Sequence, residues 1–305
     1  MINWNAFSKM DTDAWMENAN QDSKGKYVAE DFVYNVENDF LISPFTNFQG
    51  DNYSDTLFNT RTKSGIFITS MDSKTANTTA IHYLGTGVES LLFHVDTETD
   101  YSILLKDIFL EYVTIFLLPK ADYHICQKYL DAYIEQNLTK NSGNIFFVSD
   151  DQKILKAEQS FRYRLTLFVQ WIKNIPKGAT FTLFVEPKSD FLAQIAELRA
   201  LRILWHDHNF PQHDLKIIVT STPHQSNSDI HPLIIENYKL MSAYLGMSDL
   251  VAIRMEDDLE MTRLLLNMTY IFKEESRLNA VLDPVAGSYI IENLTAQMVE
   301  KASSL

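Results

Sequence analysis

From about residue 65 to its last residue, the chain alternates between two hydrophobic patterns. Short apolar runs, rich in β-branched and aromatic residues, are followed by longer stretches in which apolar residues recur every three or four positions. The short runs are typical of buried strands, and the longer stretches are typical of helices with one apolar face. Strands that alternate with helices in this way form parallel sheets joined by crossover helices.

Eight of the short runs have the composition of parallel strands, two of them more weakly. An alternation sustained from residue 65 to residue 305 favours a (β/α)8 TIM-type barrel, complete or reduced, over a doubly wound α/β sheet. The predicted strands are 66–69, 91–95, 113–118, 144–148, 153–157, 181–185, 215–220 and 250–254, of which 66–69 and 153–157 are the weaker two.

Helical periodicity predicts the crossover helices. "SKTANTTAIHYLGTG" starts at a Ser that can cap a helix and ends at glycines. "SDFLAQIAELRALRILWHDH" is predicted to be amphipathic, because apolar residues recur along it at spacings of three and four. These residues are Phe191, Ile195, Leu198, Leu201 and Trp205. "HPLIIENYKLMSAYLGMS", "EMTRLLLNMTYIFKEESRLN" and "IENLTAQMVEKASS" continue the series.

The first 60 residues are polar and aromatic, without sustained periodicity. "FTNFQGDNYSDTLFNTRTKSG" has the composition of an extended arm with turns. No linker rich in Pro, Gly or Ser divides the rest of the chain. The sequence therefore predicts an amino-terminal arm, residues 1–64, followed by one barrel domain, residues 65–305.

Composition narrows the class of protein. Apolar residues make up 46% of the chain and charged residues 22%, which is typical of a globular protein. No run approaches the roughly 18 apolar residues of a membrane span, and no secretory signal starts the chain, so we expect a cytoplasmic protein. A net charge of −14 argues against nucleic acid as a partner, and its single cysteine excludes an internal disulfide and Cys-based zinc sites.

Two groups of residues are candidates for chemistry within helical patterns. Cys126 lies in "DYHICQKYLDAYIEQ", where a free Cys is most often a small buried residue rather than a nucleophile. "WHDHNFPQHD" combines His and carboxylate residues that can bind metals. This cluster comes at a helix end before a strand, where polar residues are expected, and we assign no metal to it. Its residues are His206, Asp207, His208, His213 and Asp214.

Other candidates follow strands, which places them on the functional face of a barrel. His224, in the run 220–224, is either a general acid or a polar loop residue, and the same alternatives hold for Glu186. Ser288 lacks the flanking glycines of a nucleophile elbow, since position 290 is Ile. Gly85 and Gly87 precede a strand, so they do not form a phosphate loop. We therefore assign no catalytic, cofactor-binding or metal-binding residue from the residues alone.

Three later blocks resemble the methylmalonyl-CoA mutase family, and most closely its small, non-catalytic subunit. They are "LAQIAELRALRILW", "MSAYLGMSDLVAIRM" and "KEESRLNAVLDPVAGSYIIENLTAQMVEKA", spanning about residues 190–305; "KTANTTAIHYLGTGVESLLFHVD" adds weaker support. "DPVAGSYIIENLT" resembles the family's turn after the last barrel strand, which leads into a helix that closes the barrel. The resemblance implies an arm, a (β/α)8 barrel and, after a linker, a cobalamin domain.

The family's catalytic chain converts methylmalonyl-CoA to succinyl-CoA with adenosylcobalamin, and this sequence departs from its motifs. "KILKAEQSFRYRLTLFVQWIKN" corresponds to a family stretch that starts Gly-Tyr-His, and it has no such triplet. In "NTRTKSGIFIT", Gly65 takes the place of a CoA-binding Trp and Thr69 that of an Arg. The cobalt-ligating Asp-x-His-x-x-Gly motif occurs nowhere in this sequence.

These departures imply that the chain taken alone has lost the mutase reaction. The leading hypothesis is a non-catalytic barrel that binds no cobalamin itself and forms a heterodimer with the catalytic large subunit, which holds the adenosylcobalamin. Two alternatives are an acyl-CoA-binding enzyme with a remodelled site that uses His224 or Glu186, and a fragment of a longer mutase subunit. An inert barrel has bulky side chains on its axis, for which Phe93, Phe116 and Phe184 are candidates. The segment between "ANTTA" and "DPVAG" is short for the family, which predicts trimmed loops or a reduced strand.

Overall fold

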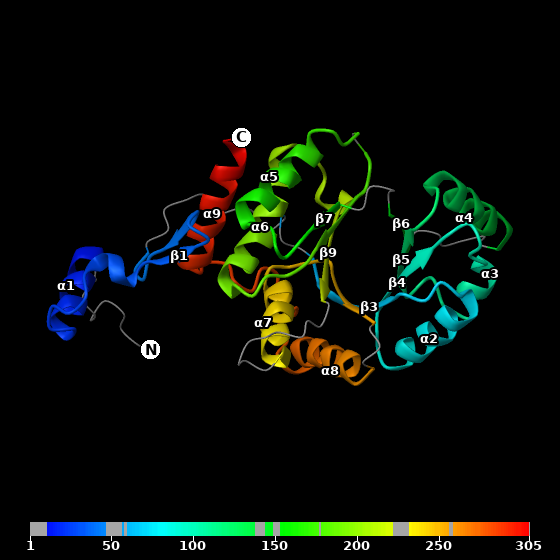
Figure 1. The fold of residues 1–305 in the computed structure, drawn as a ribbon, viewed down its shortest axis with the longest axis horizontal. Helices are drawn as coiled ribbons and strands as arrows, with labels where there is room; N and C mark the ends of the chain where they lie inside the picture. Colours follow the sequence, from blue (N-terminus) through cyan, green and yellow to red (C-terminus); the bar gives the residue numbers. More distant parts are fainter. Residues whose placement is uncertain are drawn as a thin grey trace.

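Eight parallel strands form one curled sheet in the computed structural model, which describes residues 11–46, 57, 60–137, 144–148, 153–176, 178–221, 232–255 and 259–304 (Figure 1). The strand order is β6-β5-β4-β3-β10-β9-β8-β7. Strand β10, the last of these strands along the chain, therefore pairs with β3, the first, as in a (β/α)8 barrel. The strands are β3 (Lys63–Ile68), β4 (Ser90–Val95), β5 (Thr114–Pro119), β6 (Ile145–Phe147), β7 (Lys153–Leu155), β8 (Phe181–Val185), β9 (Leu215–Ser221) and β10 (Leu250–Arg254).

Each predicted strand overlaps an observed one, so the eight strands and their order along the chain are confirmed. The predicted helices are confirmed as well. Helix α2 begins after Asp72, whose carboxylate accepts from the Thr75 N–H at 2.8 Å, so Asp72 caps this helix and not Ser73 as predicted. The helices are α2 (Ser73–Gly85), α3 (Tyr101–Leu104), α4 (Tyr123–Asn137), α5 (Phe161–Ile172), α6 (Phe191–Asp207), α7 (Pro232–Leu245), α8 (Leu259–Tyr270), which continues as a π-helix (Ile271–Glu275), and α9 (Tyr289–Ser303).

The barrel is reduced at one place, between β6 and β7. Only residues 148–152 connect these two strands, whereas each of the other consecutive strand pairs is joined through a helix. Two neighbouring parallel strands need a crossover connection of a dozen or more residues. A connection as short as this one therefore cannot place β7 beside β6. The sheet accordingly ends at β6 and β7, which lie apart in Figure 1. The sequence predicted trimmed loops or a reduced strand; the shortening lies in this connection, and all eight strands are present.

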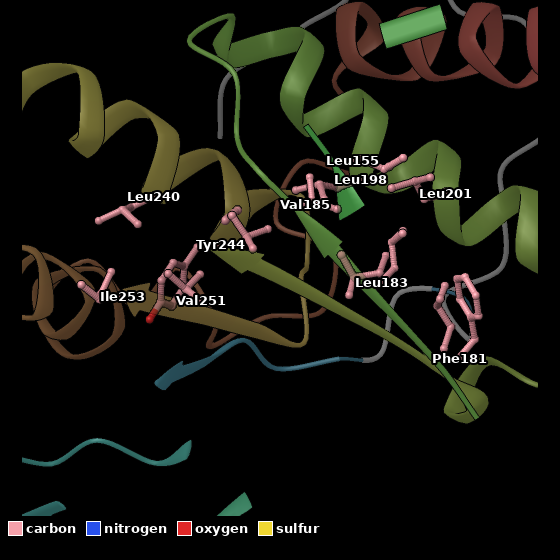
Figure 2. Close-up of a cluster of buried hydrophobic side chains, with 14 of the residues drawn as sticks. Leu155, Phe181, Leu183, Val185, Leu198, Leu201, Leu240, Tyr244, Val251 and Ile253 are labelled. Carbon is pink, nitrogen blue, oxygen red and sulfur yellow. The ribbon is translucent and has the colours of Figure 1, made fainter. Parts of the chain in front are cut away.

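The two faces of the sheet bury different apolar clusters. On the outer face, Leu183 and Val185 pack with Leu198 and Leu201 of α6 (Figure 2). A separate cluster draws on the strands and on no helix, so it lies on the inner face around the barrel axis. It contains Phe67, Leu92, Phe116, Leu118, Val148, Phe184, Ile218, Leu250 and Ala252, with Phe146 and Ile154 packed against it.

Membership of the inner cluster shows which of the residues predicted to lie on the barrel axis do so. Phe116 and Phe184 belong to it, as expected. Phe93 belongs to the outer cluster instead. Successive side chains of a strand point to opposite faces, and Leu92 points inward, so Phe93 packs toward the helices. The prediction for Phe93 was therefore wrong.

Helix α6 differs from its prediction as an amphipathic helix. Every residue from Ala193 to Trp205 is buried, including Arg199 and Arg202. The reason is a further layer, since α9 packs along α6 while α5 and α7 flank it. Helix α9 therefore covers α6 instead of closing the barrel, and the turn before it follows the π-helix and not the last strand.

The arm contains regular structure that the sequence pattern did not predict. Helix α1 (Thr12–Asp22) starts at Asp11, whose carboxylate accepts from the Ala14 N–H at 2.9 Å. A short 3-10 helix (Ala29–Phe32) and a hairpin of β1 (Tyr34–Val36) and β2 (Phe40–Ile42) follow. The hairpin buries Val36 and Phe40, whereas α1 buries no residue and lies beyond it, away from the barrel (Figure 1). Most of the predicted extended stretch lies outside the described residues.

Candidate functional site at the carboxyl-terminal mouth of the barrel

The inner face of the sheet ends in polar side chains at the carboxyl ends of β4 and β10, on either side of Phe67 of β3. His94 follows Leu92 by two residues on β4, so it points inward like Leu92. Its ring lies 4.7 Å from the Phe67 ring, centroid to centroid, in an edge-on arrangement. Arg254 is the register partner of Phe67, and its guanidinium carbon lies 5.7 Å from the Phe67 ring centre.

The electrostatics of this mouth are set by two cations around a neutral imidazole. Burial, as the largest cause, together with the positive charges of Lys120 and Arg254, lowers the pKa of His94 to about 4. His94 is therefore uncharged near pH 7. Its Nδ1 atom is buried and makes no hydrogen bond within the described part of the chain. Such a mouth can attract an anion and offer it a neutral hydrogen-bonding group, but His94 cannot act as a general acid at neutral pH.

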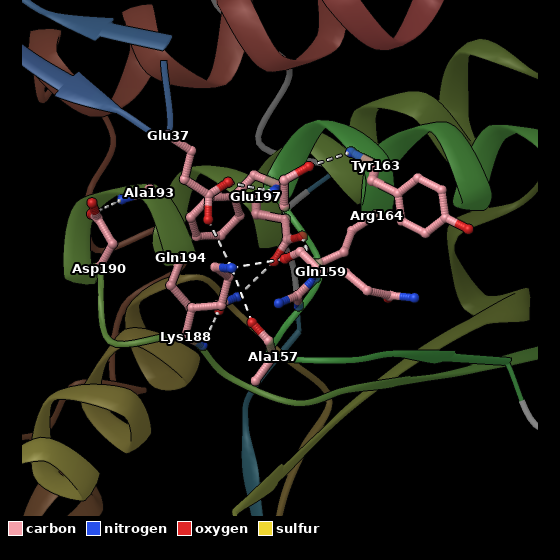
Figure 3. A network of polar contacts seen from close by, with 12 residues as sticks. Glu37, Ala157, Gln159, Tyr163, Arg164, Lys188, Asp190, Ala193, Gln194 and Glu197 are labelled. Atoms are coloured by element: carbon pink, nitrogen blue, oxygen red, sulfur yellow. Dashed lines mark hydrogen bonds and ion pairs between the residues drawn. The ribbon is translucent and has the colours of Figure 1, made fainter. Parts of the chain in front are cut away.

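On the other side of the mouth, the polar groups hold the strand ends together. The carboxylate of Glu186 accepts from the Ala157 N–H at 3.1 Å, and its carbonyl accepts from Arg164 at 3.1 Å. Lys188 donates to the carbonyls of Ala157 and Gln159 and pairs with Glu37 of the arm hairpin at 2.7 Å (Figure 3). The sequence left Glu186 open as a catalytic candidate; its carboxylate binds the end of β7.

Behind this network lies an ion pair with no exposure to solvent. Arg164 Nε of α5 lies 2.8 Å from Glu197 Oε1 of α6, and both side chains are fully buried. Gln194 donates to Glu197 Oε2 at 2.9 Å and accepts from the Lys188 N–H at 2.7 Å. The pair thus connects two helices to the loop that follows β8.

The amino-terminal mouth is a second polar region. A cavity of about 340 Å³ there includes Lys63, Thr114 and Lys216, and Lys63 donates to the Thr114 hydroxyl at 3.0 Å. Phe116 and Leu250 of the inner cluster also line this cavity. The apolar inner cluster therefore lies between the two polar mouths.

The histidine-rich cluster predicted from the sequence does not converge on one point. His206 and Asp207 are exposed and lie 3.5 Å apart, and His213 lies 3.3 Å from Asp214. His208 Nδ1 is 2.7 Å from the Leu204 carbonyl oxygen. In the described ranges, no three His, Cys, Asp or Glu side chains are grouped as metal ligands.

The remaining candidates are placed as follows. Cys126 is fully buried in α4, as predicted. Gly85 and Gly87 lie at the end of α2 before β4, also as predicted. Ser288 is the cap residue of α9, without a side-chain hydrogen bond. His224 lies outside the described residues.

The turn 283–288 is held by α6 rather than by its own capping groups. Arg199 donates to Asp283 and to both carboxylate oxygens of Glu292, the latter at 3.0 Å. Gly287, at a φ of +77°, donates its N–H to Glu292 at 3.3 Å. The Pro, Gly and Ser of this run thus allow the chain to turn, and Arg199 of α6 holds the turn in place.

Sequence reasoning missed His94, because the apolar run "SLLFHV" reads as a core strand. The available signal was its position: a titratable residue two places after an inward Leu, at the carboxyl end of a barrel strand. Arg254, at the end of β10, has the same position on its strand.

Comparisons with known proteins agree with the resemblance found in the sequence. Residues 177–305 match the family model described as methylmalonyl-CoA mutase. The methylmalonyl-CoA mutase of Cereibacter sphaeroides is 31% identical over 134 residues, an alignment that covers 38% of this chain. The chain spans 18% of the length of that relative. Among the described residues, no helix is long and apolar enough to cross a membrane.

Proposed function

We propose that this chain, whose residues 177–305 match the methylmalonyl-CoA mutase family model, is a non-catalytic, small-subunit-like barrel of that family that supports a catalytic mutase chain. In this proposal the catalytic large subunit converts methylmalonyl-CoA to succinyl-CoA, and this chain stabilises it in a cytoplasmic heterodimer. The chain alone has no mutase activity.

The observation that carries the proposal is the apolar inner cluster. A thioester that passes along the barrel axis needs a channel lined by small polar side chains, whereas Phe67, Phe116 and Phe184 occupy the inner face. At Gly65, the position that the resemblance gives to a CoA-binding Trp, an added Cβ would lie 2.8 Å from Leu250 Cδ1 and 3.1 Å from the Ser90 carbonyl oxygen. A Trp cannot fit there without moving β10 or β4.

The described residues also do not fit adenosylcobalamin. The sequence has no Asp-x-His-x-x-Gly motif. The imidazole at the mouth, His94, packs edge-on against Phe67 and lies near the cations Lys120 and Arg254, which disfavour a metal cation at that nitrogen. We therefore infer that the partner chain holds this cofactor.

The proposal is tested by co-expressing this chain with a tagged catalytic mutase chain from the same organism. We expect the two to co-purify at equal stoichiometry and the activity of the catalytic chain to survive heating longer with its partner present. The chain purified alone should show no turnover of methylmalonyl-CoA with added adenosylcobalamin. Turnover by this chain alone, or failure to co-purify, contradicts the proposal.

A second candidate function, binding of an anionic acyl-CoA by a remodelled barrel, is favoured by the two cations beside His94. Calorimetry with methylmalonyl-CoA and succinyl-CoA separates the two. The inert barrel should bind neither more tightly than roughly millimolar, or about −4 kcal/mol. Tighter binding that Lys120→Ala and Arg254→Ala both weaken favours the acyl-CoA-binding enzyme.

A further inference from the structure

A groove separates two helices that flank neighbouring strands. Strands β10 and β3 are paired along five residues, and helices α8 and α2 follow them in the chain. Helices that follow neighbouring strands of a barrel usually pack on each other, as α6 and α7 do here. Between α2 and α8, however, lies a groove of about 700 Å³.

The bottom of the groove is apolar. Tyr83 of α2 and Leu266 of α8, which are 8% and 3% exposed, lie there with the half-buried Met255 that follows β10. The α2 wall includes the small side chains of Thr78 and Thr79 beside the larger His82. Protein interiors are close-packed, so side chains this small leave space that larger ones would fill.

In the described lining of the groove, the polar side chains besides Tyr83 are three threonines, His82, Asn267, Tyr270 and the pair of Glu260 with Arg263. At one end the Thr86 and Tyr270 hydroxyls lie 3.4 Å apart, and the Asn267 amide lines the α8 wall. The two charged residues of the lining neutralise each other, since Arg263 donates to Glu260 at 2.6 Å. Among the described residues, a ligand that brought a charge into the groove would find Glu260 and Arg263 already paired with each other.

We propose that this groove binds a neutral, mostly apolar small molecule that carries one or two hydroxyl, carbonyl or amide groups. The volume lies within the usual range for small-molecule sites, roughly 300–1,000 Å³, and an apolar floor with a few convergent polar groups is their usual composition. The apolar body of the ligand lies on Tyr83, Met255 and Leu266, and its polar groups meet Thr86, Asn267 or Tyr270. The proposal is independent of the role of the barrel axis.

The test uses Nile red, a neutral apolar dye, titrated into the full chain and followed by its fluorescence. We expect saturable one-to-one binding in the micromolar range. Thr79→Phe places a ring in the groove and should weaken binding at least tenfold. Ile81→Phe is the matched control: it lies on the same helix, is 39% exposed and does not line the groove, so it should bind as the wild type does.

A second measurement does not depend on the folding of the filled variant. In the wild-type chain with 13C-methyl methionine, the Met255 signal, assigned through Met255→Leu, should shift as the dye is added. Equal binding by Thr79→Phe and wild type, or an unmoved Met255 signal at saturation, overturns the proposal. So does a concentration-dependent dimer that excludes the dye and that Thr79→Phe dissociates, because a second copy of the chain would then occupy the groove.

Discussion

The half of the barrel built from β7 to β10 and the half built from β3 to β6 differ in the buried interactions that stabilise them. In the former, Arg164, Arg199 and Arg202 are buried, and each pairs with a carboxylate. In the latter, the buried polar side chains in the described ranges 63–137 and 144–148 are those of Ser64, Ser90 and Thr114. One half thus depends on specific charge pairs, and the other mainly on apolar packing.

The difference has a structural cause and a consequence for the sequence. Helix α9 adds a layer over α5 and α6, so Arg164, Arg199 and Arg202 on these helices have no route to solvent. A buried charge needs its particular partner, whereas apolar residues of similar volume replace one another at little cost. Sequence changes are therefore more restricted in the half with buried charges. The match to the family model, residues 177–305, falls in that half.

The largest expected effect comes from breaking the fully buried pair. Arg164→Ala leaves the Glu197 carboxylate buried without its partner, which should lower the free energy of unfolding by about 3–5 kcal/mol in urea at pH 7. The matched control is the double variant Arg164→Met with Glu197→Leu, which removes both charges and should lose less than the single variant.

The same variant has an expected pH dependence. Burial raises the pKa of Glu197, while Arg164 opposes the rise. Without Arg164 the pKa rises further, so the folded variant binds a proton that the unfolded chain releases, and its stability falls as pH rises. The deficit of Arg164→Ala should therefore shrink from pH 7 to pH 5. A deficit below about 1 kcal/mol at pH 7 contradicts the dependence on charge pairs.

A smaller loss is expected in the apolar half from overfilling its inner face. Gly65→Ala brings a Cβ within 2.8 Å of Leu250 Cδ1, so we expect a loss of about 1–3 kcal/mol in the same unfolding assay. Gly85→Ala is the control, because nothing lies within 4 Å of its added Cβ, and it should cost nothing. Equal stability of the two variants would mean that the inner face is loosely packed.

His94, in the apolar half, should make the free energy of unfolding depend on pH. Its pKa is lowered to about 4, so between pH 6.5 and pH 4 the unfolded chain binds more protons and stability falls as pH falls. NMR titration should find His94 titrating near pH 4. Lys120→Ala removes a nearby positive charge and should raise the pKa of His94; an unchanged value would exclude Lys120 from the mouth.

The smallest effect is expected from an exposed pair. Arg162 lies 3.2 Å from Asp39, but its side chain is 50% exposed. Arg162→Ala should therefore change the free energy of unfolding by less than about 1 kcal/mol, and 0.5 M NaCl should reduce the difference further. A loss as large as that of Arg164→Ala would show that burial is not what separates the two pairs.

The strands could be predicted in detail from the sequence. The face of the sheet toward which each side chain points was harder to predict. Apolar runs identified β4, β5 and β8 nearly to the residue, because a buried parallel strand is a continuous apolar segment. The same continuity hid the alternation that puts Phe93 outward and Phe116 inward. It also hid His94, which looks like an interruption in a core strand until its neighbours on β3 and β10 are known.

Local order along the chain determined the eight strands, the helices between them and the short connection at 148–152, because these depend on residues close together in sequence. The absence of the family's cobalt-ligating motif was also readable from the sequence alone. Only the tertiary structure decided that α6 is buried on all sides and that the turn at 283–288 is anchored by Arg199. It also decided that Arg254 meets Phe67 beside His94. Arg199 and Asp283 are 84 positions apart, and no local pattern specifies a pairing between side chains that meet only when the helices pack.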